Sequence, residues 1–98
     1  MSDLPPYQQA MALVAAARVH YERGALLDAL APLRQAVLLF ASEAPSAPDQ
    51  LLARADACHF YGDCLTEIEE HAEAANVYQE AADLYAQLHH PEGEALAQ

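Results

Sequence analysis

Two segments of the chain repeat one pattern of small and large residues, and the second copy follows the first by 45 residues. Gly62 in the second copy matches Ala17 in the first, and Ala74 matches Ala29. Within each copy, apolar residues recur three and four positions apart, the spacing that lines one face of an α-helix. Small residues at matching positions let two helices approach closely. The pattern therefore predicts two pairs of packed helices.

The boundaries of these helices follow from the apolar periodicity and from the glycines and prolines between periodic segments. We expect helices at about 6–23, 26–43, 48–69 and 72–89, with Gly24 ending the first. The chain is then one all-α domain, 1–98, with repeat 1 over about 6–43 and repeat 2 over about 48–89. Residues 91–98 are interpreted as a short helix that begins a third copy.

Pro32 is the irregular residue of the second helix. In a helix interior proline removes one hydrogen bond and crowds the carbonyl four residues earlier, at a cost of roughly 3 kcal/mol. Either the helix starts late, with Asp28 as its N-cap, or it kinks near Asp28. Gly62 is also unusual in a helix, and we expect it to mark a close crossing.

The acidic residues are concentrated in the second half of the chain. The sequence holds 15 acidic residues, four arginines and no lysine, for a net charge of −11, and residues 55–98 contribute −10 of it. Such a surface repels phosphate, so nucleic acid and anionic membranes are not expected partners. A basic peptide or protein face is favoured, and the alternative is an acidic face that serves only solubility.

The cellular setting is predicted from the cysteines and from hydropathy. Cys58 and Cys64 point about 120° apart on one predicted helix, so they cannot bridge within it, and reduced thiols are expected. No apolar run approaches the roughly 20 residues that span a bilayer, and no signal-peptide core is present. The sequence predicts a cytoplasmic protein.

The residues of the second copy resemble the tetratricopeptide repeat. Their order is Cys58-x2-Tyr61-Gly62-x2-Leu65, followed by Ala74-x3-Tyr78 and Ala81. The copies depart from the family pattern at the opening aromatic and the closing proline, and the offset exceeds the usual ~34 residues. The resemblance implies antiparallel hairpins stacked into a right-handed superhelix. The alternative is an antiparallel four-helix bundle.

The resemblance also implies a binding site, because the first helices of such repeats line a concave groove that holds a peptide. Carried over residue by residue, the first copy presents Met11, Val14, Arg18, Tyr21 and Glu22, and the second presents Asp56, His59, Asp63, Thr66 and Glu67. This predicts a non-catalytic adaptor, chaperone-like or regulatory module for a protein or peptide with apolar and basic side chains. Alternatively, these are only solvated helix faces.

Two further hypotheses follow from the sequence. Two repeats leave apolar ends open, which predicts a homodimer or a capping partner. Asp56, His59 and Asp63 share one helix face, and carboxylate–imidazole clusters can bind a divalent metal. No nucleophile motif, phosphate loop or cofactor fingerprint accompanies them, so neither an enzyme nor a cofactor is predicted.

Overall fold

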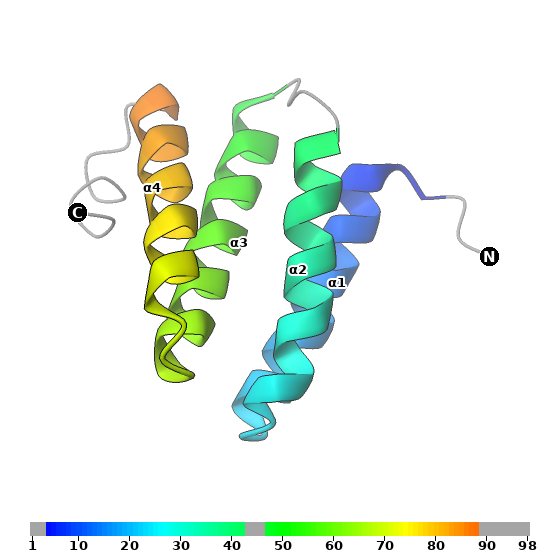
Figure 1. Cartoon of the computed structure of the whole chain (residues 1–98). Helices are drawn as coiled ribbons and strands as arrows, with labels where there is room; N and C mark the ends of the chain where they lie inside the picture. The colour runs from blue at the N-terminus through cyan, green and yellow to red at the C-terminus, as the bar shows by residue number, and fades with distance from the viewer. Residues whose placement is uncertain (1–3, 43–46, 89–98) are drawn as a thin grey trace. The chain divides into compact units, whose positions relative to one another are not determined.

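The computed structural model describes residues 4–42 and 47–88, which form four helices and, within these ranges, no strand (Figure 1). The helices are α1 (Pro6–Glu22), α2 (Leu26–Ser42), α3 (Pro48–Glu67) and α4 (His71–Leu88). The all-α prediction is confirmed, and each described helix ends within two residues of its predicted limit. The predicted segment 91–98 lies outside the described residues.

The chain divides into two compact units, residues 1–45 and residues 46–98. In the first unit α1 packs against α2, and in the second α3 packs against α4, each pair as an antiparallel hairpin (Figure 1). We call these the first and second hairpin. The stacking of the hairpins into a superhelix stays a prediction, as does the alternative, a four-helix bundle. No helix in the described ranges combines the length and the apolar character needed to cross a bilayer.

The two hairpins turn in the same way. Gly24 has a φ of 79° and Glu69, 45 residues later, has a φ of 64°, so both lie in the left-handed region. Gly24 N donates to Tyr21 O at 3.0 Å, and Glu69 N donates to Thr66 O at 3.0 Å. The following residues also correspond, since α2 begins at 26 and α4 at 71. The internal repeat seen in the sequence is therefore present in the backbone of both turns, where left-handed residues close the helix.

Pro32 lies inside α2, which begins at Leu26, so the late start with Asp28 as N-cap, one of the two alternatives, is wrong. Figure 1 shows α2 as one continuous helix. The Ala29 amide donates to Ala25 O at 3.2 Å, so helical bonding is established before the proline. The apolar face of α2 outweighs the lost bond, because Leu33, Ala36 and Phe40 are buried after it.

The core of the first hairpin is made of small residues and a few large ones. Ala10 and Ala17 of α1 are fully buried, as are Ala29, Leu33 and Ala36 of α2. At the open end of the hairpin, the rings of Tyr7 and Phe40 meet edge to face, with centroids 6.0 Å apart. Alanine brings the helices together but removes little apolar area from water, so among these buried residues Leu33 and Phe40 contribute the most apolar burial.

The core of the second hairpin has its closest approach at Gly62. A Cβ placed on Gly62 would lie 2.6 Å from Cε1 of Tyr78, closer than real Cβ contacts. The prediction that Gly62 marks a close crossing is confirmed. Around it the hairpin buries Ala55, Cys58, Tyr61, Leu65, Ala74, Ala81, Leu84 and Tyr85.

Candidate functional site

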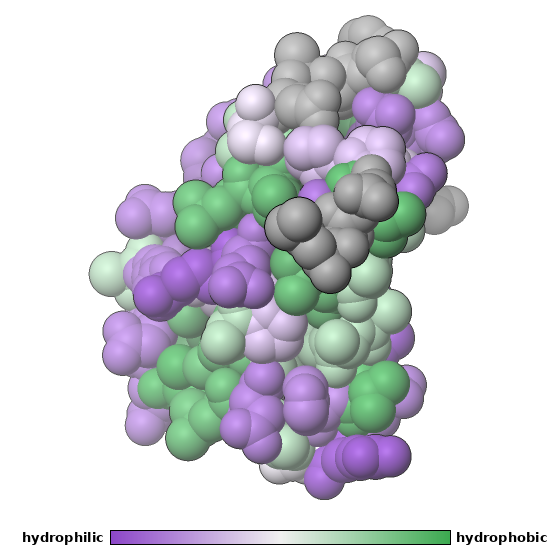
Figure 2. All heavy atoms as spheres, turned by 90° about the vertical axis from the view of Figure 1, so that its right-hand side faces the viewer, coloured by the Kyte–Doolittle hydropathy of each residue, from purple (hydrophilic) through white to green (hydrophobic). Residues whose placement is uncertain are grey.

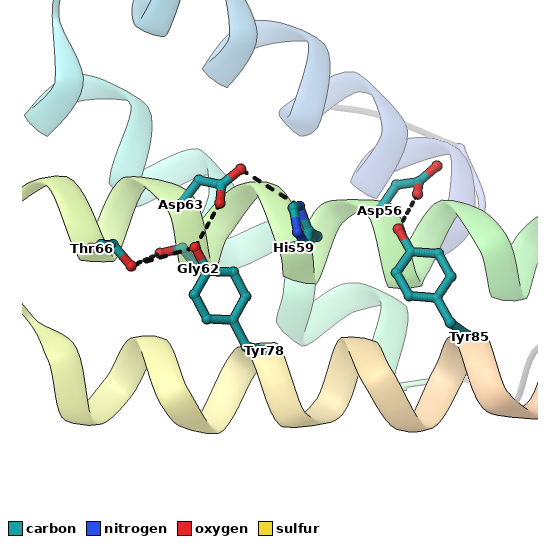
Figure 3. A network of polar contacts seen from close by, with 7 residues as sticks. All are labelled: Asp56, His59, Gly62, Asp63, Thr66, Tyr78 and Tyr85. Atoms are coloured by element: carbon teal, nitrogen blue, oxygen red, sulfur yellow. Dashed lines mark hydrogen bonds and ion pairs between the residues drawn. The ribbon is translucent and has the colours of Figure 1, made fainter. Parts of the chain in front are cut away.

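One flank of the second hairpin carries two tyrosine–aspartate hydrogen bonds (Figure 3). The Tyr85 hydroxyl donates to Asp56 Oδ1, and the Tyr78 hydroxyl donates to Asp63 Oδ1 at 2.6 Å. The aspartates lie seven residues apart on α3 and the tyrosines seven apart on α4. Because seven residues make two helical turns, the two pairs repeat in register along the antiparallel helices. The tyrosines thus fix the orientation of both carboxylates.

The other flank of the hairpin repeats the same spacing with different residues. Arg54 Nη2 lies 3.2 Å from Glu80 Oε2, and the Tyr61 hydroxyl donates to Glu73 Oε2 at 2.9 Å. Arg54 and Tyr61 are again seven residues apart, as are Glu73 and Glu80. The Cys58 thiol also donates to Glu80 Oε2 at 3.4 Å. Polar pairs therefore border the apolar core of this hairpin on both sides.

His59 and Thr66 complete the network on the Tyr78 side (Figure 3). His59 Nδ1 lies 3.5 Å from Asp63 Oδ2, and its ring centroid lies 5.4 Å from that of Tyr78. Thr66 Oγ1 donates to Gly62 O at 2.9 Å and lies 3.4 Å from the Tyr78 hydroxyl. Asp63 thus faces one hydrogen-bond donor from α4 and one imidazole from its own helix.

Burial and neighbouring carboxylates raise the pKa values of two phenols and both thiols of this hairpin. Desolvation, followed by the hydrogen bond to Asp56, raises the pKa of Tyr85, and desolvation with the bond to Asp63 raises that of Tyr78. Desolvation and then the Glu80 charge raise the pKa of Cys58 to about 12. Desolvation, then Glu67 and Asp63, raises the pKa of Cys64 to about 11. Neither cysteine forms a disulfide, and thiols in this state are poor nucleophiles.

The five groove residues predicted from the second copy all lie on one face of α3. Asp56, Thr66 and Glu67 are exposed, and His59 and Asp63 are half-buried. Four of the five take part in the network just described, which the sequence reading missed. An ionised carboxylate can accept several hydrogen bonds. Tyr78 and Tyr85 therefore orient Asp63 and Asp56 without using up their capacity for a further donor.

The five groove residues predicted from the first copy lie on one face of α1. Met11, Arg18, Tyr21 and Glu22 are exposed, and Val14 is half-buried. The exposed fractions of Met11 and Tyr21 are 42% and 38%. Each predicted set thus shares one helix face, while the single groove that joins the two sets stays a prediction.

The metal site suggested for α3 is not assembled in the structure. Across residues 4–42 and 47–88, no three His, Cys, Asp or Glu side chains lie close enough together to hold a metal ion. His59 pairs with Asp63, while Asp56 is held by Tyr85 at the other end of the face.

The first hairpin has an apolar hollow that the sequence reading did not single out. It is open, has a volume of about 630 Å³ and lies between α1 and α2. We call it the leucine hollow, and its lining includes Gln9, Ala12, Leu13, Gln35, Leu38 and Leu39. Leu38 is 64% exposed. The signal in the sequence is a second apolar row on α2, on the side away from its buried stripe.

The chain was compared with protein-family models, curated proteins and solved structures, and none of the three comparisons finds a match. The resemblance to the tetratricopeptide repeat therefore rests on the residues and spacing of the two copies.

Proposed function

We propose that the chain is a non-catalytic protein-interaction module that binds a partner segment with basic and apolar side chains. The observation that carries this proposal is the pair of oriented carboxylates on the exposed face of α3. Asp56 and Asp63 are held by Tyr85 and Tyr78 of α4, and Glu67 lies one turn beyond Asp63 on the same face.

Orientation matters because flexible acidic side chains lose rotamer freedom when they bind a cation. That loss costs roughly 0.5–1.5 kcal/mol for each side chain that binding immobilises. The tyrosines impose most of this order before any partner arrives. Lysine or arginine side chains spaced about two helical turns apart would match the spacing of Asp56 and Asp63. The net charge of −11 adds long-range attraction for a basic partner.

The first hairpin supplies the apolar part of the proposed recognition. Large apolar side chains that remain exposed in the described residues include Met11, Val19, Leu27 and Leu38, all in this hairpin. Exposed apolar patches on a small protein mark interaction surfaces more often than solitary apolar residues do. A partner with both basic and apolar side chains uses both properties of the chain.

Selection from a displayed library of random peptides tests this proposal. Peptides captured by the chain should be enriched in lysine or arginine together with leucine, isoleucine or methionine. Asp56→Asn with Asp63→Asn should reduce their affinity about tenfold or more, since charge-assisted contacts are worth about 1.5–3 kcal/mol each. Asparagine keeps the acceptor oxygen for each tyrosine, so the hairpin should stay folded.

A matched control changes the charge by the same amount elsewhere. Asp83→Asn with Glu70→Gln neutralises two exposed carboxylates of the second hairpin that lie off the α3 face. This variant should lower the affinity by less than about threefold, through long-range electrostatics alone. No enriched peptide sequence, or equal losses in both double variants, would refute the proposal.

A further inference from the structure

His59 lies between the two oriented carboxylates on the face of α3 (Figure 3). Asp56 comes three residues before it and Asp63 four residues after it, so the three side chains share one side of the helix. The proposed function depends on the carboxylates and assigns no role to the imidazole. Histidine is the side chain whose charge ordinarily changes between about pH 5 and pH 8. The position of His59 therefore makes the charge of this face depend on pH.

The contacts of Asp63 show what a proton on the imidazole does. Asp63 Oδ1 accepts the hydrogen bond from the Tyr78 hydroxyl at 2.6 Å, and Asp63 Oδ2 lies 3.5 Å from His59 Nδ1. The tyrosine bond thus leaves Oδ2 as the oxygen that can pair with a cation. A neutral imidazole leaves this oxygen to a lysine or arginine of a partner, whereas an imidazolium pairs with it first.

We propose that His59 is a pH-sensitive switch of the α3 face, which binds a basic partner while His59 is neutral and releases it when His59 is protonated. This inference rests on the proposed function and adds the regulation of the same site. The switch requires no refolding, because the proton arrives on an imidazole that already lies beside Asp63.

Tyr78 of α4 holds both members of the switch in place. Its ring centroid lies 5.4 Å from that of His59, and its hydroxyl bonds Asp63. Desolvation, followed by the bond to Asp63, raises the pKa of Tyr78 above its ordinary value. The phenol therefore stays protonated throughout the range in which histidine titrates. One side chain positions the imidazole and the carboxylate without titrating with either.

The other titratable groups around His59 do not change their charge in the same range. The helix packed against α3 is α4, which also directs Tyr85 to this flank, where burial raises the pKa of its phenol. Carboxyl groups ordinarily titrate below about pH 5. Those of α4 that bond α3 on the opposite flank are Glu73 and Glu80, and those that share the α3 face with His59 are Asp56, Asp63 and Glu67.

The size of the effect follows from the exposure of the pair. The side chains of His59 and Asp63 are 28% and 47% exposed. Ion pairs with this exposure change an equilibrium by up to about fivefold. Because the imidazolium cancels one of the two oriented charges and also repels the cation of the partner, protonation should weaken binding by about fivefold or more.

The affinity for a basic peptide at two pH values tests the inference. The probe is a rhodamine-labelled peptide of about 14 residues with blocked ends, composed of lysine, leucine and glutamine, so that it does not titrate itself. Fluorescence anisotropy with the full chain should show binding at about pH 8 that is about fivefold or more weaker at about pH 5.5. In His59→Gln, which stays neutral, the affinity should change by less than about twofold between the same pH values.

His71→Gln is the matched control, because it removes an exposed histidine at the start of α4, beyond the hairpin turn from the α3 face. Figure 2 shows hydrophilic side chains spread over the face that it presents, and exposed charges are screened beyond about 8 Å at physiological ionic strength. A histidine outside the α3 face should therefore contribute little, and His71→Gln should keep the full pH dependence of the unmodified chain.

Each other outcome has a defined meaning. Equal affinity of the unmodified chain at both pH values, a pH dependence that persists in His59→Gln, or one that disappears in His71→Gln would overturn the inference. A loss of helix at about pH 5.5 in circular dichroism would assign the weaker binding to unfolding and would also overturn it. If the peptide binds equally at both pH values and Asp56→Asn with Asp63→Asn weakens it, the inference fails and the proposed function stands. No binding at about pH 8 would refute both.

Discussion

Single residues decide how each hairpin closes, and the left-handed position after the first helix is the clearest example. Gly24 and Glu69 occupy equivalent positions with φ values of 79° and 64°. Glycine adopts this conformation without strain, whereas a residue with a Cβ pays roughly 1–2 kcal/mol. The second hairpin therefore carries strain that the first avoids.

Substitutions at these two positions should change stability in opposite directions. Glu69→Gly should raise the free energy of unfolding by about 0.5–1 kcal/mol, since the relief of strain exceeds the entropy that glycine adds to the unfolded chain. Gly24→Ala should lower it by about 1 kcal/mol. Urea denaturation followed by circular dichroism measures both, and changes of the same sign would contradict the equivalence of the two turns.

Gly62 allows α3 and α4 to approach closely. Its replacement by alanine has two opposing effects on stability, a gain in helix propensity and a clash with Tyr78. Alanine gains up to about 1 kcal/mol of helix propensity over glycine. The added Cβ would collide with the ring of Tyr78, and overpacking of this kind typically costs about 1–3 kcal/mol, with the bond to Asp63 also weakened. Gly62→Ala should therefore destabilise the chain by about 1–2 kcal/mol.

The sign of this effect should reverse when the ring is absent. In a Tyr78→Ala background the Cβ added at position 62 meets no ring, so Gly62→Ala should stabilise by up to about 1 kcal/mol. Thermal unfolding of the four proteins in this double-mutant cycle gives the comparison. A destabilisation that persists without the Tyr78 ring would show that something else requires glycine at 62.

At the scale of the helices, polar pairs in a seven-residue register hold α3 against α4. Tyr85–Asp56 and Tyr78–Asp63 lie on one flank, and Arg54–Glu80 and Tyr61–Glu73 on the other. The Arg54–Glu80 pair is partly exposed and contributes up to about 1 kcal/mol. The Tyr85 bond should contribute more, because its phenol is buried and its acceptor is charged.

Removal of the Tyr85 hydroxyl should therefore lower stability and alter its pH dependence. Tyr85→Phe should cost about 1–2 kcal/mol at pH 7. Burial and the Asp56 bond raise the pKa of Tyr85, so its contribution is complete below about pH 10, the ordinary pKa of tyrosine, and is lost as pH rises further.

Urea denaturation between pH 7 and pH 11 measures this contribution. The unmodified chain should lose more stability above pH 10 than Tyr85→Phe does. The thiols of Cys58 and Cys64, with a raised pKa, add a loss that begins near pH 9 in both proteins and so cancels in the comparison. Parallel pH profiles for the two proteins would contradict the assignment.

The sequence predicted the helices and the crossing, because these depend on local spacing. Gly24 and Gly62 are informative since only backbone geometry or close contact explains glycine there. The tyrosine–aspartate pairs were not predicted, because they depend on how far each helix is rotated about its own axis. Once the register of the two helices is known, the same seven-residue spacing is seen on both. It separates Asp56 from Asp63 on one helix and Tyr78 from Tyr85 on the other.

The leucine hollow was not predicted for a related reason. The stripe that includes Leu26, Leu33 and Phe40 accounts for the contact of α2 with its partner helix. Leu38 then reads as an isolated surface residue. Its position beside Leu13 and Leu39 becomes visible only when α1 and α2 are placed side by side.

At the scale of the whole molecule, apolar exposure and negative charge belong to different parts of the chain. Among the residues that the structure describes, the exposed leucines lie in residues 4–42, whereas the charge of −10 belongs to residues 46–98. A partner that carries apolar and basic side chains is complementary to the exposed leucines and to the negative charge. Our central claim is that a partner with basic side chains binds the oriented carboxylates on the face of α3.

An NMR titration of the ¹⁵N-labelled chain with a peptide that contains lysine and leucine tests that claim most directly. We expect saturable shifts of backbone amides on the α3 face, at Asp56, His59 and Asp63. Amides near Leu27 and Asp83 should move little. Shifts spread evenly over the chain, or shifts that miss the α3 face, would contradict the claim.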